Sequence, residues 1–228
     1  LIYSQPDQIK SARMHKTSPH KIFNDKDLAI WIDSNIMIRG NISPMVREFI
    51  ASGADFGTIS HPYRRSVKEE VIALKNIGKE KNRFEQVNRY LDEGYPDSEL
   101  TETNFLLMNL KSERTRATLD EWSRQIQQFS SRDQLSFDYA CWKFGASKMR
   151  LPIFGLSVRS DARFLYVEHG AVEPDARKMR VLSGTGETHH MPSTVIVVIT
   201  ICGDLQRDRT RICIVEEPLD VVAIERAR

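Results

Sequence analysis

Two continuous apolar segments place the strongest constraint on the fold. LAIWID at 28–33 is a compact run of strand-forming residues that ends in a carboxylate, and VIVVITIC at 195–202 is a longer β-branched run. Runs that are apolar at every position are typical of strands buried on both faces, as in a parallel sheet. Helical spacing of apolar residues recurs between them, around 44–51, 66–91 and 116–129. Strands alternating with helices predict an α/β fold.

Composition limits the classes of function. The 228 residues are enough for a sizeable core. The chain has 33 Lys and Arg against 31 Asp and Glu, a net charge of +2. This charge is too small to indicate a nucleic-acid-binding protein, which is usually strongly basic. No apolar run approaches the roughly 20 residues that span a bilayer, so we expect no transmembrane segment in this chain and a cytoplasmic location. Three cysteines without a C-x-x-C pair argue against a disulfide framework or zinc knuckle.

The first apolar segment is followed by two oxygen-bearing side chains. Asp33 and Asn35 lie two positions apart at the end of the expected strand, at the sheet edge where α/β proteins bind ligands. Carboxylate and amide oxygens suit Mg²⁺ or Mn²⁺ that holds a diphosphate. Asp and Asn are also common turn residues, so the pair alone leaves both interpretations open.

A second polar motif, HPYR at 61–64, follows the expected short strand FGTIS. Arg64 could clamp a phosphate, and His61 could bind a metal or a sugar hydroxyl. Alternatively these are loop residues, and the acidic Glu69 and Glu70 only stabilise the start of the next helix. Positions 61–90 hold eight Lys and Arg against four Glu, which fits either a solvated helix face or a basic wall beside a phosphate.

The third motif is SRDQ at 131–134, which fits the capping box S-x-x-Q. In that arrangement Ser131 accepts the backbone N–H of Gln134, the Gln134 side chain reaches back, and a helix continues to about residue 144. Capping does not require Arg132 or Asp133. Asp133 could therefore be a positioned base or a hydroxyl-binding group.

Five motifs, taken in their order along the chain, resemble those of a known family. They are WIDSNIMI, HPYR followed by a Glu, LDEGYP, an L-x-E stretch, and a Trp followed by SSRDQLSF. Over roughly residues 10–145 the chain resembles the glycosyltransferase-like domain family first catalogued as a domain of unknown function, with relatives linked to plant cell-wall and bacterial surface polysaccharide. The resemblance implies a GT-A-like nucleotide-sugar transferase fold. In that fold a strand-end D-x-D, here D-x-N, handles a diphosphate bridged by Mn²⁺ or Mg²⁺.

The resemblance also implies roles for individual residues. Asp133 and Glu70 become catalytic carboxylates. The residues that the resemblance implies to bind the donor or substrate are Asp33, Asn35, His61, Arg64, Arg132 and Gln134. The implied metal ligands are Asp33, Asn35 and His169, the last in a segment similar to a late metal-binding His-x-x-Gly.

The same comparison predicts the domain organisation. Residues 1–150 form a partial glycosyltransferase-like domain, 151–192 an irregular extension rich in Gly and Pro, and 193–228 the start of a second α/β domain. A GT-A domain usually has a nucleotide-binding βαβ segment before its D-x-D, but only 32 residues precede Asp33. We therefore expect the fold to be incomplete at its N-terminus.

The expected function is transfer of a sugar from a nucleotide-sugar donor to a polysaccharide or glycoconjugate acceptor. Two alternatives remain open. One is a non-catalytic carbohydrate-binding or scaffold module that kept the fold. The other is a divalent-metal phosphohydrolase built on Asp33, which is disfavoured because no further carboxylate follows immediately beside Asp33.

Overall fold

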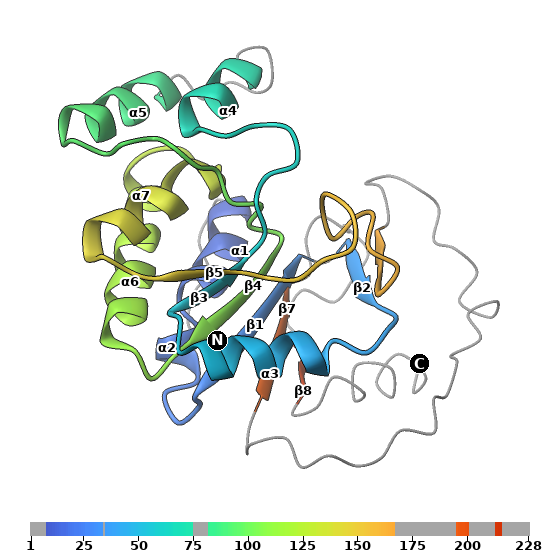
Figure 1. Ribbon diagram of the computed structural model, residues 1–228. Coiled ribbons are helices and arrows are strands. Elements are labelled where there is room, and N and C mark those ends of the chain that lie inside the picture. The colour runs from blue at the N-terminus through green and yellow to red at the C-terminus, as the bar shows by residue number, and fades with distance from the viewer. Residues whose placement is uncertain (1–7, 34, 75–81, 167–194, 201–212, 216–228) are drawn as a thin grey trace.

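The computed structural model describes residues 8–33, 35–74, 82–166, 195–200 and 213–215. Its centre is a six-stranded mixed sheet in the order β5-β3-β4-β1-β7-β8 (Figure 1). The strands are β1 Leu28–Asp33, β3 Phe56–Thr58, β4 Phe105–Asn109, β5 Lys148–Arg150, β7 Val195–Thr200 and β8 Cys213–Val215. A separate two-stranded sheet pairs β2 Ile36–Ile38 with β6 Phe164–Tyr166.

The two apolar segments of the sequence are neighbours in the larger sheet. β1 pairs with β7 in parallel and with β4 in antiparallel orientation. Both apolar runs therefore form strands, as predicted, and the α/β class is confirmed in the form of a mixed sheet. The sequence did not predict that these two strands pair with each other. The prediction that a second domain begins near residue 193 stays a prediction.

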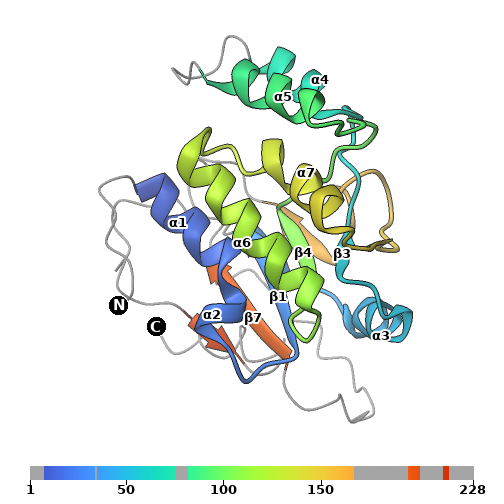
Figure 2. The same ribbon diagram turned by 90° about the vertical axis from the view of Figure 1, so that its left-hand side faces the viewer.

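Helices lie on both faces of the sheet (Figure 2). The helices of the described residues are α1 Gln8–Thr17, α2 Pro19–Ile22, α3 Ser43–Ser52, α4 Val67–Ala73, α5 Arg83–Asp92, α6 Glu113–Gln128 and α7 Gln134–Phe144. Of these, α4 and α5 lie beyond α7, away from the sheet (Figure 2). The helices expected from apolar spacing are present, and the region 66–91 is divided into α4 and α5. No helix in the described part of the chain is long and apolar enough to cross a membrane.

The side chains of β1 alternate between two cores. Ile30 and Ile32 pack in the same cluster as Met45 and Phe49 of α3, whereas Trp31 packs in the cluster that includes residues of α6 and α7. Because successive side chains point to opposite faces, Asp33 lies on the same face as Trp31. That face is the one covered by α1, α6 and α7 (Figure 2).

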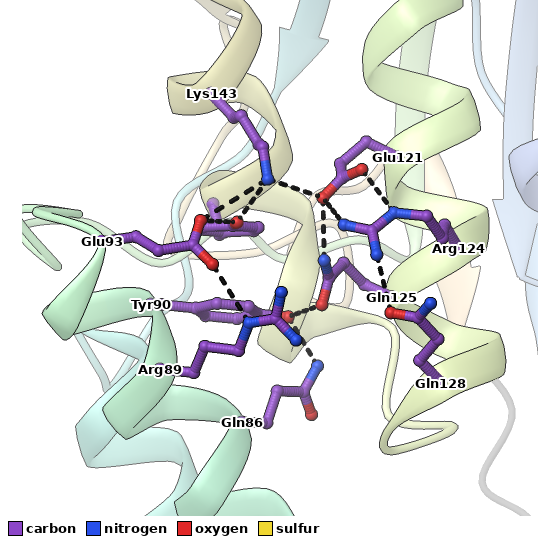
Figure 3. A network of polar contacts seen from close by, with 10 residues as sticks. Gln86, Arg89, Tyr90, Glu93, Glu121, Arg124, Gln125, Gln128 and Lys143 are labelled. Atoms are coloured by element: carbon purple, nitrogen blue, oxygen red, sulfur yellow. Dashed lines mark hydrogen bonds and ion pairs between the residues drawn. The ribbon is translucent and has the colours of Figure 1, made fainter.

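A polar network fastens α5 to α6 and α7 (Figure 3). The Gln86 amide donates to the Tyr90 hydroxyl over 2.7 Å, and Tyr90 donates to Gln125 over 2.9 Å. The Gln125 amide in turn donates to Glu121 over 2.8 Å. Because buried polar groups are costly unless paired, this chain of hydrogen bonds favours one placement of α5. α4, which packs on α5 and α7, is held by the same arrangement.

The predicted capping box at 131–134 is wrong. α7 begins at Gln134 with Asp133 as its N-cap residue, and Asp133 makes no side-chain cap hydrogen bond. The Gln134 amide donates instead to the Thr101 carbonyl over 3.3 Å, towards the segment before β4. The tertiary contact replaces the local one, because Gln134 is buried against that segment.

Candidate functional site

The site begins at the carboxyl end of β1. The Trp31 indole donates to Asp33 Oδ1 over 2.8 Å, and the Asp33 backbone N–H donates to the Asn104 carbonyl over 2.8 Å. The Asp33 side chain keeps 28% of its surface exposed. The strand end therefore presents a fixed but accessible carboxylate.

Lys16 of α1 connects Asp33 to the start of α7. Its side chain is fully buried, and its Nζ lies 2.5 Å from Asp133 Oδ2 and 3.3 Å from Asp33 Oδ1. The ammonium also lies 5.2 Å from the centre of the Trp31 ring and 5.8 Å from that of Trp122. Two carboxylates that are 100 positions apart in the sequence thus share one buried cation.

Asp133 is almost completely enclosed, with 4% of its side chain exposed. It accepts a hydrogen bond from the Thr103 hydroxyl over 2.9 Å, and the Arg13 guanidinium lies 3.5 Å from its Oδ1. Burial acts to raise the pKa of Asp133, but the charges of Arg13 and Lys16 outweigh it and hold the pKa well below its usual range. The carboxylate therefore stays ionised and is a weak proton acceptor.

Glu70 organises a second group of charges. Its side chain is fully buried, and its Oε1 accepts from Arg132 Nε and Nη2 over 3.1 and 2.9 Å. Arg64 Nε forms an ion pair with its other oxygen. The side chains of Arg64 and Arg132 remain 28% and 37% exposed. Two guanidinium groups, the preferred partners of phosphate, are thus held together at the surface.

His61 lies against this pair of arginines. Arg64 Nη2 is 2.9 Å from His61 Nε2, and His61 Nδ1 accepts the backbone N–H of Arg64 over 3.1 Å. Burial and then the Arg64 guanidinium lower the pKa of His61 to about 4. The imidazole is therefore neutral at pH 7.

The low pKa of His61 predicts a pH dependence of stability. The unfolded chain binds a proton at His61 below about pH 6.5, whereas the folded chain does not until about pH 4. Its contribution to the free energy of unfolding is therefore lost as the pH falls from 6.5 towards 4. Urea unfolding across this range should give a flatter pH profile for His61→Asn, whose Oδ1 can replace Nδ1 as acceptor. An unchanged profile would contradict the assignment.

The two groups of charges join through neighbouring residues. Asp33, Lys16 and Asp133 form one chain of contacts, and Arg132, beside Asp133, continues it to Glu70, Arg64 and His61. The three sequence motifs therefore meet in space. Asn35 is half-buried in the turn after β1, Gln134 points to Thr101, and His169 lies outside the described residues.

Glu102 was not assigned a role from the sequence, although it is the Glu of the L-x-E stretch. It is 4% exposed, its Oε2 accepts from the Ser157 hydroxyl over 2.6 Å, and Arg159 Nε is 3.5 Å from its Oε1. Burial raises the pKa of Glu102, and the charge of Asp33 adds to the effect. The nearby Asn104 side chain acts in the opposite direction and lowers the pKa of Glu102.

Lys16 was also missed. A lone lysine in a polar N-terminal segment reads as a solvated charge, and its partners come from distant strands and helices. The only local signal that could have found it is the spacing that places Arg13 and Lys16 on one face of a helix.

Comparison with known proteins now adds to this geometry. Residues 2–168 match the family described as TOD1/MUCI70, glycosyltransferase-like domain. The chain belongs to this family. The match includes all the motifs that meet in the site and extends past β6. Membership supports a general glycosyltransferase role.

Two further matches are short. The chain is 64% identical over 33 residues to the recombination protein RecR of Chloroflexus aggregans, which is 14% of this chain and 16% of that protein. It is 71% identical over 28 residues to RecR of Nocardia farcinica, 12% of this chain and 14% of that protein. The chain therefore spans about a sixth of the length of these curated relatives. No solved structure matches.

The site residues do not fit a resident divalent metal. No group of three His, Cys, Asp or Glu side chains comes together within the described ranges. Asp33 and Asp133 both face the Lys16 ammonium. A divalent cation prefers several oxygen ligands whose charge is not already neutralised. Binding of a divalent metal by Asp33 and Asn35 thus stays a prediction. The side chains that surround Asp33 do not favour it.

Proposed function

We propose that this member of the TOD1/MUCI70 family transfers a sugar from a nucleotide-sugar donor to a polysaccharide or glycoconjugate acceptor. The observation that carries the proposal is the meeting of Asp33, the paired Arg64 and Arg132, and the buried Asp133 at one edge of the sheet. Family membership supports the transferase class. The cationic pair supports a donor that contains a diphosphate.

In the proposed reaction, residues of this chain have separate roles. Arg64 and Arg132 bind the diphosphate of the donor through charge-assisted hydrogen bonds that are present both before and during its departure. Asp33 accepts hydrogen bonds from hydroxyl groups of the donor. The oxygen of the acceptor hydroxyl forms the new bond to the anomeric carbon and gives up its proton, while the bond between that carbon and the diphosphate breaks.

The two predicted catalytic carboxylates take different roles in the proposal. The side chains of Asp133 and Glu70 are 4% and 0% exposed, and both are paired with cations. A side chain with almost no exposed surface makes little contact with a substrate. We therefore assign both as positioning residues, Asp133 for Lys16 and Glu70 for the two arginines.

Two measurements separate the proposal from its alternatives. Calorimetry with UDP- and GDP-sugars, followed by assays of sugar release and transfer, tests the transferase. A chain that binds glycans but no nucleotide sugar would be a carbohydrate-binding module. Release of phosphate from an aryl phosphate would favour the phosphohydrolase, and we expect none.

Asp33→Asn tests the assignment of the strand-end carboxylate. The amide keeps an acceptor for the Trp31 indole but removes the charge, so we expect turnover of the nucleotide sugar to fall by about tenfold. Asp27→Asn is the matched control, because Asp27 is half-exposed and pairs with the exposed Lys111. Equal turnover in the two variants would remove Asp33 from the site.

A further inference from the structure

The carboxylates of the site are already neutralised by the chain itself. Asp33 and Asp133 supply two negative charges. Lys16 and Arg13, both on α1, supply two positive charges within 3.5 Å of them. No net negative charge remains in this set of four residues to attract a further cation.

The position of the ammonium is the second part of the argument. Lys16 Nζ lies between oxygens of Asp33 and Asp133, where an ion that bridged these carboxylates would have to sit. A divalent ion there would displace the ammonium or be repelled by it. Displacement is costly, because the lysine side chain is fully buried and would lose both of its carboxylate partners.

Aromatic rings hold the ammonium in place. Trp31 on β1 and Trp122 on α6 lie within 6 Å of Nζ, a distance at which a ring face attracts a cation. Trp31 also donates to Asp33. The cation and its carboxylate are therefore fixed by the same side chain.

We propose that the Lys16 ammonium is the resident cation of this site and occupies the place that a divalent metal would otherwise take. Binding of a nucleotide diphosphate is then independent of Mn²⁺ and Mg²⁺. The second statement rests on the proposed function. The first concerns the chain alone and stands without it.

Titration of the 228-residue chain with Mn²⁺, followed by electron paramagnetic resonance, tests the first statement. The wild type should bind no Mn²⁺ at Asp33. Lys16→Ala leaves two carboxylates and a vacant space, so it should bind Mn²⁺ and be stabilised by it against heat. Lys21→Ala is the matched control, because Lys21 is 53% exposed and pairs with Asp120. This control should behave as the wild type.

Mn²⁺ binding by the wild type that disappears in Asp33→Asn would overturn the proposal. A folded Lys16→Ala that gains no Mn²⁺ binding would overturn it as well. If Lys16→Ala does not fold, the wild-type titration still decides. Calorimetry of UDP with EDTA and with Mn²⁺ should give affinities within about twofold of each other. UDP binding in neither condition would count against the proposed function and would leave the Mn²⁺ result standing.

Discussion

Replacing Asp133 with alanine is expected to lower the free energy of unfolding by about 3–5 kcal/mol, the cost of removing one partner from a buried ion pair. The reason is the environment of Lys16. Its ammonium is fully buried and lies 2.5 Å from Asp133, and Asp33 at 3.3 Å is its other carboxylate partner. The Thr103 hydroxyl also loses its acceptor. Urea unfolding at pH 7, analysed by linear extrapolation, measures the loss.

An exposed ion pair provides the matched control for this prediction. Asp120 is 52% exposed and lies 2.6 Å from Lys21, so Asp120→Ala should cost less than about 1 kcal/mol. Asp133→Ala should also differ from the wild type in acid. Because the pKa of Asp133 is depressed, its contribution is present above about pH 4 and is lost as the pH falls below that value. Asp133→Ala should therefore lose less stability on acidification than the wild type. Equal costs for the two alanine variants would contradict this account.

Apolar patterning predicted much of the fold. The continuous apolar runs at 28–33 and 195–202 predicted strands, and the structure has β1 and β7 there, paired in parallel. The antiparallel insertion of β4 beside β1 was not predictable, because antiparallel and parallel central strands have the same apolar composition when both faces are covered. The start of α7 was misplaced because Gln134 bonds to Thr101 from another segment.

The motifs identified which residues meet but not what each one does. Asp33, Arg64, Glu70, Arg132 and Asp133 were all singled out in the sequence, and the contacts of the folded chain join them. Their roles depend on burial and on partners from elsewhere in the chain, which local sequence does not contain. Lys16 illustrates the limit, because a cation in a polar segment becomes the centre of the site only after α1 packs on the sheet.

Glu70→Gln is expected to raise the KM for the nucleotide sugar by about 100-fold with little change in kcat, since charge-assisted hydrogen bonds of roughly 1.5–3 kcal/mol are lost. The amide keeps the volume of the side chain but loses the negative charge that holds Arg64 and Arg132 together. Without it the two guanidinium groups repel each other and move apart. Steady-state kinetics with a varied donor concentration measures both constants.

Glu69→Gln is the matched control, because Glu69 is an exposed neighbour whose carboxylate accepts a local hydrogen bond from the Arg65 backbone N–H over 2.7 Å. This variant should retain the wild-type KM. The same experiment distinguishes the two roles considered for Glu70. A positioning residue acts through the arginines and changes KM, whereas a proton-transfer group changes kcat and its pH profile. A large fall in kcat at unchanged KM would therefore restore Glu70 as a catalytic carboxylate.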